Sequence, residues 1–366
     1  MKRAGLLAIA GALVFACDRS EEAVAPAESD VVAGCEPSDG APSDLRCTGL
    51  YADFASKTLS PRARPFAPAV AFWSDGADKQ RFIDLPDGAP IDTTSMDEWR
   101  FPVGTKVWKE FRVSGTLVET RFFHKVRDDR WVHAAYVWSP DGSSATKSDG
   151  VDVDVGGVKY HVPKSSECSD CHKGKKDKLL GFEAISLGQP GASGLTLAAL
   201  AAEGRLSAPP ATTSVAIADD GTKRAPALAW LHVNCGTSCH TGTTLGTAYG
   251  TGLRLKIGFE EIATKPPATW DIVTSTVGVA VKSPKWSGET RIVAGDASSS
   301  LLLRLLAQRG GEQMPPIATK LVDDAGKSAV EVWIAAMTPA AVELPPPEPP
   351  AEPPADPPPE PPGDDS

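Results

Sequence analysis

Two clusters of cysteine and histidine are the residues of this 366-residue chain whose spacing points most directly to chemistry. The first is Cys168-Ser169-Asp170-Cys171-His172, the C-x-x-C-H pattern of covalent haem c attachment. Two thiols at this spacing reach the two vinyl groups of one porphyrin edge, and the adjoining histidine supplies the proximal iron ligand. The alternatives are a thioredoxin-like cysteine pair and half of a zinc site. The sequence lacks the βαβ pattern and the second C-x-x-C that these need.

The second cluster is C-x-x-x-C-H over residues 235–240, with one extra residue between Cys235 and Cys239. Gly236 gives the backbone room to loop out that extra position, so both sulfurs can still reach one porphyrin edge. His240 then takes the place of the proximal ligand. The alternative is a local disulfide between the two cysteines, with His240 an incidental neighbour.

Distal ligands are sought among the remaining methionines and histidines. Met314 lies in a Met-Pro-Pro run and is the candidate thioether ligand of the second haem, where Met/His ligation raises the reduction potential. A methionine that merely packs in the core is the alternative, and His232 is the substitute ligand. The first haem has no obvious distal ligand, and its candidates are His124, His133 and His161. An open sixth position there would permit small-molecule chemistry.

The N-terminus has the pattern of an export signal. Lys2 and Arg3 precede a short apolar run that ends at Ala16-Cys17 and resembles the lipobox of bacterial lipoproteins. Residues 1–16 are therefore expected to be a lipoprotein signal peptide and Cys17 the lipidated residue, which anchors the protein at the periplasmic face or the cell surface. An ordinary secretory signal beside a cysteine is the alternative.

The net charge of −10 belongs to the two ends of the chain. Residues 17–60 form an acidic, flexible tether in which Cys35 and Cys47 are expected to form a disulfide, because an exported chain meets oxidising conditions. Residues 343–366 form a Pro- and acid-rich disordered tail that favours polyproline II. The stretch between them is nearly neutral, which argues against nucleic acid as a partner.

The fold class predicted from hydrophobic patterning is α+β. Residues 61–165 alternate like antiparallel strands between Asp/Gly turns and predict a β-rich domain, a sandwich being the expected form. Residues 166–342 predict a mostly helical, cytochrome c-like haem-binding region with a strand-like, irregular insertion at 250–293. The predicted strands cover 81–85, 106–113, 117–123 and 131–138, and the predicted helices cover 195–206, 227–233, 300–308 and 325–337.

Further runs, in order along residues 60–337, resemble a little-characterised family of predicted exported dihaem c-type cytochromes of bacteria. They are residues 72–79, 85–86, 99–105, 119–121, 136–138, 167–172, 180–182 and 234–235. The resemblance implies two covalent haems c, at Cys168/Cys171/His172 and Cys235/Cys239/His240, with Met314 in the family's Met-Pro-Pro run. It implies an electron carrier with redox partner proteins rather than a substrate-turning enzyme. The alternatives are a dihaem peroxidase-like reductase with one open haem and a haem-free binding or structural lipoprotein with disulfides.

Overall fold

The computed structural model describes Cys35 and residues 40–339. The expected signal peptide, the lipidation site Cys17 and the proline-rich tail lie outside the described residues. Within them, no helix is both long enough and apolar enough to cross a membrane.

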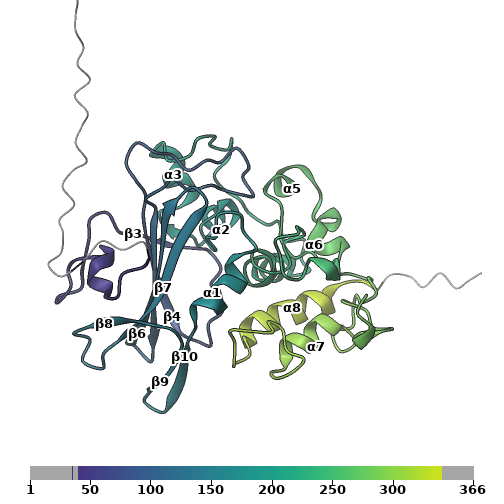
Figure 1. Cartoon of the computed structure of the whole chain (residues 1–366). Coiled ribbons are helices and arrows are strands. Elements are labelled where there is room, and N and C mark those ends of the chain that lie inside the picture. Colours follow the sequence, from purple (N-terminus) through teal and green to yellow (C-terminus); the bar gives the residue numbers. More distant parts are fainter. Residues whose placement is uncertain (1–34, 36–39, 340–366) are drawn as a thin grey trace, which may run out of the picture.

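The fold is α+β and is built around one large antiparallel sheet of seven strands (Figure 1). The spatial order is β11 (Ser193–Gly194), β3 (Arg64–Ala67), β4 (Asp78–Asp84), β5 (Lys106–Val113), β6 (Thr116–Arg127), β7 (Arg130–Trp138) and β8 (Ala145–Ser148). Two separate hairpins pair β1 (Tyr51–Asp53) with β2 (Thr58–Leu59) and β9 (Val151–Val155) with β10 (Val158–Val162). The predicted strands fall within β4 to β7, but the expected sandwich of two stacked sheets is not confirmed.

Both faces of the large sheet bury apolar side chains, because successive residues of a strand point to opposite faces. On one face Phe82, Trp108 and Phe122 pack beneath the segment that holds β1 and β2. On the other face Ile83 and Phe123 join the largest core cluster, which the helices complete. The second face is therefore the one that meets both cysteine clusters.

The helices follow mainly after the large sheet (Figure 1). They are α1 (Ser165–His172), α2 (Ala184–Gly188), α3 (Leu197–Ala202), α4 (Arg224–Leu231), α5 (Phe259–Thr264), α6 (Asp271–Thr274), α7 (Leu301–Ala307) and α8 (Asp324–Ala336). Single turns are η1 (Leu45–Thr48), η3 (Tyr249–Thr251), η4 (Pro267–Thr269), η5 (Pro284–Trp286) and the π-helical η2 (His232–Gly236). The four predicted helices correspond to α3, α4, α7 and α8.

The expected strand-like insertion at 250–293 is wrong. It contains α5, α6 and short 3₁₀ turns, and its β pairing is limited to isolated bridges such as Val277 with Ile292. Its β-branched residues suggested strands. Glycines and prolines interrupt them too often for a continuous ladder to form.

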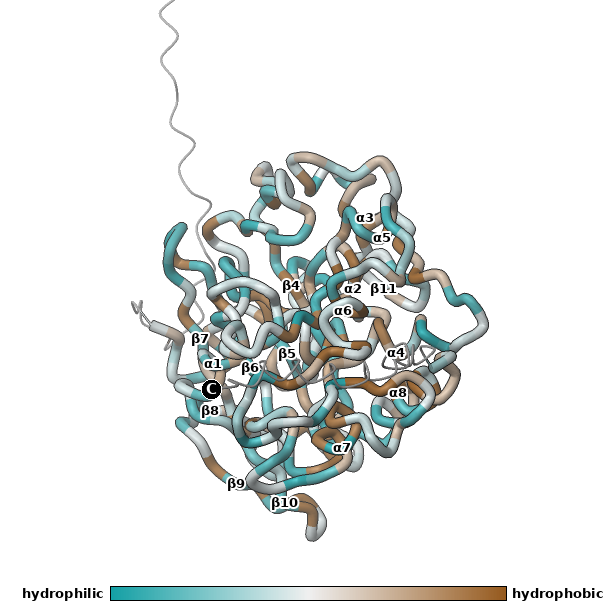
Figure 2. The backbone as a smooth tube through the Cα atoms, turned by 90° about the vertical axis from the view of Figure 1, so that its right-hand side faces the viewer, coloured by the Kyte–Doolittle hydropathy of each residue, from teal (hydrophilic) through white to brown (hydrophobic). Residues whose placement is uncertain are grey.

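Helices α4 and α8 pack closely, and α4 contributes Leu231 to the cavity described below (Figure 2). Gly326 of α8 lies against the Trp230 indole of α4, where an added Cβ would come within 2.1 Å of the ring. The same indole donates its N–H to Asp323 at 2.7 Å, and Asp323 caps the start of α8. The close contact of Gly326 with Trp230 and the Asp323 cap thus fix how α4 and α8 cross.

Cys35 and Cys47 form a disulfide with their Cα atoms 5.4 Å apart. Cys47 lies in the turn η1, whose Leu45 is fully buried beneath the large sheet. The disulfide therefore ties Cys35 to a segment that is packed against the sheet. It lies remote in sequence from both C-x-x-C-H-like clusters.

Candidate functional site

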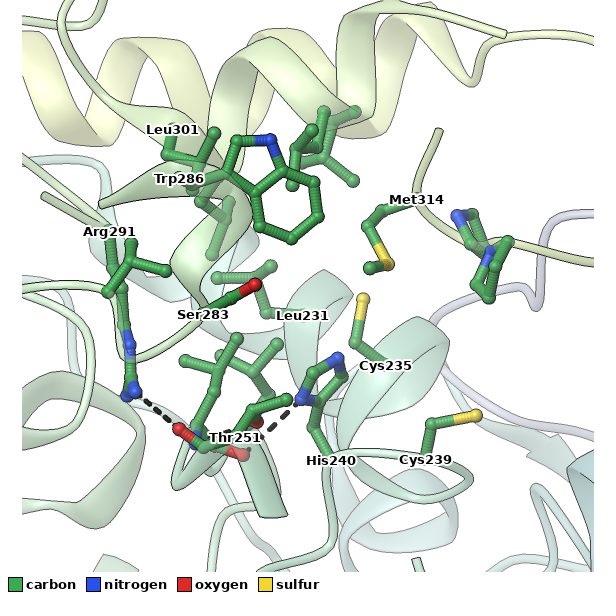
Figure 3. Close-up of a pocket in the computed structure, with 18 of the residues that line it drawn as sticks. Leu231, Cys235, Cys239, His240, Thr251, Ser283, Trp286, Arg291, Leu301 and Met314 are labelled. Carbon is green, nitrogen blue, oxygen red and sulfur yellow. Dashed lines mark hydrogen bonds between the residues drawn. The ribbon is translucent and has the colours of Figure 1, made fainter. Parts of the chain in front are cut away.

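An apolar cavity of about 300 Å³ lies beside the second cysteine cluster (Figure 3). Its walls come from the turns η2, η3 and η5, the helix α7 and the Met-Pro-Pro run. Leucine is the commonest lining residue, with seven members: Leu231, Leu253, Leu255, Leu301, Leu302, Leu305 and Leu306. Cys235, Cys239, His240 and Met314 line the same cavity, so the structure brings together all four residues predicted for the second site.

The extra residue of the second cluster is absorbed by a π-helical turn. The turn η2 continues α4, and the Thr237 N–H donates to the His232 carbonyl at 2.9 Å, five residues back. Inserting one residue into a helix gives this geometry. Gly236 lies so close to the Leu255 carbonyl that an added Cβ would be 2.3 Å from its oxygen. The glycine therefore permits a close backbone contact as well as the wider turn.

His240 is held with one ring nitrogen available for a metal. Its Nδ1 lies 3.3 Å from the Leu253 carbonyl oxygen, which can only accept, so the proton must be on Nδ1. Burial lowers the pKa of the imidazole to about 4, so the ring is neutral at neutral pH. The Nε2 lone pair is then the free donor, as in metal-bound histidines whose other nitrogen is hydrogen-bonded.

Sulfur atoms occupy the side of the cavity toward which His240 Nε2 points. In Figure 3 the Met314 thioether and the Cys235 thiol both point toward the cavity, whereas the Cys239 thiol turns away from His240. Met314 is fixed by its N–H, which donates to the Leu305 carbonyl at 2.9 Å. Burial, with a contribution from Cys239, raises the pKa of the Cys235 thiol to about 12, which keeps it protonated.

The residues present fit a haem c. The donor set is two thiols, a neutral imidazole and a thioether, and the surrounding walls are apolar. This fit rests on the chemistry of the donors and on the cavity that they share.

Two cavity residues were not anticipated from the sequence. Arg291 donates to the carbonyls of Thr251 at 2.5 Å and Ser275 at 2.7 Å, and so braces the wall beside η3. Trp286 contributes its ring, and its buried Nε1 has no hydrogen-bond partner among the described residues. The only sequence signal was an isolated Trp and Arg within an irregular segment, which indicates no particular contact.

The first cluster lies on α1, where Cys168 and Cys171 are three residues apart and so share one face. His172 donates from Nδ1 to the Lys178 carbonyl at 2.5 Å, which again leaves Nε2 free. Burial, and then the charge of Lys109, lower the pKa of His172 to about 3. The imidazole is thus neutral, as a haem ligand must be. The space enclosed beside it is only about 10 Å³, so a haem would lie largely outside this pocket.

The histidines proposed as distal ligands are all engaged elsewhere. The rings of His133 and His172 both stack on the Phe123 ring, with centroid distances of 5.2 and 4.4 Å, respectively. His133 Nε2 also lies 2.9 Å from the Ser165 hydroxyl. His161 contacts two carboxylates, and His124 follows Phe123 on the strand and so faces the opposite side of the sheet.

His232, the substitute ligand for the second haem, is also excluded by its contacts. Its Nδ1 accepts the Ile257 N–H at 2.9 Å, and its Nε2 faces the Glu183 carboxylate at 3.5 Å. The side chain is completely buried and is not part of the cavity wall. His232 therefore braces the segment after the second cluster.

The two clusters are in direct contact. The Ser238 hydroxyl, within the second cluster, donates to the Cys171 carbonyl at 3.0 Å. An added Cβ on Gly174 would lie 1.7 Å from the Ser238 carbonyl oxygen, so the backbones touch immediately after the first cluster. All four cluster cysteines are free thiols. Groups held at the two clusters would therefore be neighbours.

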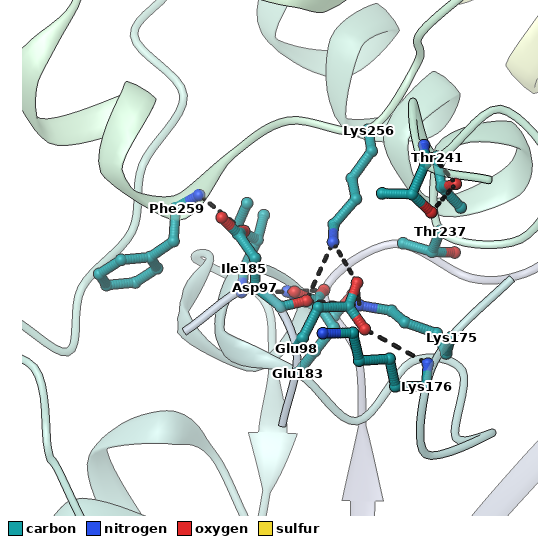
Figure 4. A network of polar contacts seen from close by, with 12 residues as sticks. Asp97, Glu98, Lys175, Lys176, Glu183, Ile185, Thr237, Thr241, Lys256 and Phe259 are labelled. Carbon is teal, nitrogen blue, oxygen red and sulfur yellow. Dashed lines mark hydrogen bonds and ion pairs between the residues drawn. The ribbon is translucent and has the colours of Figure 1, made fainter. Parts of the chain in front are cut away.

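A polar network clamps the segments that follow the clusters (Figure 4). Lys175 and Lys256 both donate to the Asp97 carbonyl at 2.9 Å, and Lys256 lies 2.7 Å from the Glu98 carboxylate. The Phe259 N–H donates to the Asp97 side chain at 2.9 Å. Because Asp97 and Glu98 belong to the sheet half of the chain, the network joins three distant segments at one point.

Comparisons with protein-family models, with curated proteins and with solved structures found no match for this chain. Within the described residues, no group of three or more His, Cys, Asp or Glu side chains is placed to hold a bare metal ion.

Proposed function

We propose that this protein is an exported, membrane-anchored dihaem c-type cytochrome that transfers electrons through two covalently attached haems. The observation that carries the proposal is the cavity in which Cys235, His240 and Met314 converge between leucine walls. The first cluster repeats the thiol and imidazole set on α1. When bound, haem c supplies a one-electron Fe(III)/Fe(II) couple.

Each residue of the second site has a distinct role. Cys235 and Cys239 would hold the haem through two thioether bonds. The Leu253 carbonyl fixes the orientation of His240, whose Nε2 would be the proximal iron ligand. Met314 would supply a second sulfur ligand, and the leucines would exclude water and help set the potential.

At the first site, Cys168 and Cys171 would supply the attachments and His172 the proximal nitrogen. The hydrogen bond from Ser238 to the Cys171 carbonyl, which joins the two cysteine clusters, supports a close pair of haems. This arrangement supports electron transfer between the haems within the molecule and exchange with redox partner proteins. Lipidation at Cys17 would hold the protein at a membrane.

The test is to produce the full chain together with haem c maturation machinery. A reduced-minus-oxidised spectrum, pyridine haemochrome stoichiometry and an intact mass should then show two covalent haems. The double variants C168S/C171S and C235S/C239S should each retain one. Zero covalent haem, with masses that indicate disulfides, would overturn the proposal in favour of a haem-free lipoprotein. If the unmodified chain carries only one covalent haem, the cluster without a haem is not an attachment site.

A second candidate function is a peroxidase-like reductase. It is favoured by one observation: His133 and His161 have other contacts and His124 lies on the opposite face of the sheet, so none of the three would serve as a second ligand of the first haem. A high-spin signal and peroxide turnover that persist in C235S/C239S would support it. A wholly low-spin spectrum without peroxide turnover would exclude it.

A further inference from the structure

Three cations form a row across the large sheet beside the first cluster. Arg81 of β4 is directly opposite Lys109 of β5, and Lys109 is directly opposite Arg121 of β6. Directly opposite residues point to the same face, so three positive side chains stand next to one another. Like charges in such positions repel and destabilise the sheet unless something compensates them.

Only one of the three has its own carboxylate. Arg121 makes a two-point contact with Glu119, at 2.7 and 3.0 Å, and Glu119 also accepts the Tyr160 hydroxyl at 2.6 Å. Among the described residues, no carboxylate forms an ion pair with Arg81 or Lys109. Arg81 and Lys109 therefore lie next to each other without a carboxylate of their own.

Arg81 is the most exceptional member. It is only 5% exposed, and two of its guanidinium nitrogens, Nε and one Nη, are buried with no hydrogen-bond partner among the described residues. A buried charged donor without a partner is costly, and its presence indicates a group that completes it.

Lys79, two residues before Arg81 on the same strand, adds a fourth cation to this face. Its ammonium donates to the Phe72 carbonyl and to the Ser74 hydroxyl at 2.6 Å. Asp78 and Asp323 act on it from a distance, and burial with the charges of Arg81 and Arg121 lowers its pKa to about 7. Neutral oxygens thus hold Lys79, which has no ion pair with a carboxylate among the described residues.

The row adjoins the first haem-attachment cluster. Lys109 and Arg121 line the small pocket that His172 and Phe123 also line. At about 10 Å³ this space takes roughly one water-sized atom, such as a single oxygen of a larger anion. That size favours a carboxylate on an arm whose parent molecule lies outside the pocket.

We propose that Arg81 and its cross-strand neighbour Lys109, which lines the small pocket, form a binding site for a carboxylate or small oxyanion, and that its occupant is a propionate of the haem attached at Cys168 and Cys171. The choice of occupant rests on the proposed function, whereas the anion site itself does not. A free anion has the same chemistry and is distinguished by the experiment.

Thermal unfolding tests the site in haem-free protein, titrated with sodium sulfate at constant ionic strength. At about ten times its Kd, sulfate should raise the Tm by about 3 °C in the unmodified chain. R81Q should lose most of this gain, and K109Q should lose part of it. R64Q, which removes the same charge from an exposed ion pair with Glu203, should respond like the unmodified chain. Equal responses of the unmodified chain and R81Q would overturn the site.

Haem-loaded protein identifies the occupant. If a propionate fills the site, loading abolishes the Arg81-dependent sulfate response. R81Q in the C235S/C239S background should also lower the reduction potential of the remaining haem, because a nearby cation favours the reduced state. An undiminished sulfate response after loading would overturn the propionate and establish a free-anion site. Failure of haem attachment at Cys168 and Cys171 would overturn the propionate as occupant, and the sulfate result in haem-free protein would still decide the anion site.

Discussion

Each cluster histidine is oriented through Nδ1 by a backbone carbonyl from the loop that follows it. His172 uses Lys178, and His240 uses Leu253. A carbonyl cannot donate, so both imidazoles take the tautomer that leaves Nε2 unprotonated. The spacing of the sequence identified both histidines, but these partners, six and thirteen residues further on, depend on the folded loops.

Met314 allows the distal ligand to be tested at a single side chain. We expect M314L to keep haem attachment and to cost less than about 1.5 kcal/mol of stability, since the volume changes little. Its reduction potential should fall, because loss of a Met/His pair lowers it. Redox titration with an optical readout measures the change.

Met337 provides the matched control, since it packs partly buried against the same core cluster but does not line the cavity. M337L should leave the potential unchanged. Equal potentials in M314L and the unmodified protein would show that Met314 is a packing residue.

Asp177 is expected to fix the loop after the first cluster. It accepts the Lys125 ammonium at 2.8 Å, the Trp131 indole N–H at 2.8 Å and the Phe101 N–H. Because D177A leaves Lys125 buried without its partner, we expect a loss of about 3–5 kcal/mol in the free energy of unfolding. Urea titration followed by tryptophan fluorescence measures it.

The control for this variant is D170A, which removes an exposed ion pair with Lys173. Such pairs contribute at most about 1 kcal/mol, so its midpoint should barely move. Similar losses for D177A and D170A would contradict the role given to the buried pair.

At the scale of elements, the π-helical turn η2 contains the first residues of the second cluster, Cys235 and Gly236. G236A should destabilise the protein by about 3 kcal/mol, because the added Cβ meets the backbone of Leu255 and Lys256, which has little freedom to yield. Gly250 lines the same cavity, and a Cβ added there has no neighbour within 4 Å, so G250A should be well tolerated. Thermal unfolding and haem content of the two variants compare these effects; similar behaviour would show that the close approach is unimportant.

Sequence patterns predicted elements well where one face is buried. Strand β5 matches the predicted run 106–113, and α8 lies within one residue of its predicted bounds at either end. The helix α1 was missed, because SSECSDCH has no apolar period to reveal it.

The row of cations on the large sheet could not be predicted from the sequence, for another reason. Arg81, Lys109 and Arg121 become neighbours only through strand register, which depends on the completed sheet.

At the scale of the whole molecule, the two halves expected on either side of residue 165 share a core. The largest cluster includes Phe66 and Phe123 from the sheet together with Leu228 and Ile334 from the helices. Strand β11, from the second half, pairs with β3 at the edge of the sheet. The sequence placed the change of secondary structure correctly, but it could not show that the apolar surfaces of both halves face each other.

This shared core predicts one cooperative unfolding transition. Separating residues 40–165 from 166–339 would expose Phe66, Phe123 and their partners, and burial of apolar area is the main source of stability. We therefore expect calorimetry of the full chain to give a single peak. Residues 166–339 produced alone should lack the cooperative transition, and adding residues 40–165 should restore it. Two separate transitions, or a well-folded isolated second half that attaches haem by itself, would show that the halves are independent domains and that the first cluster does not need the sheet.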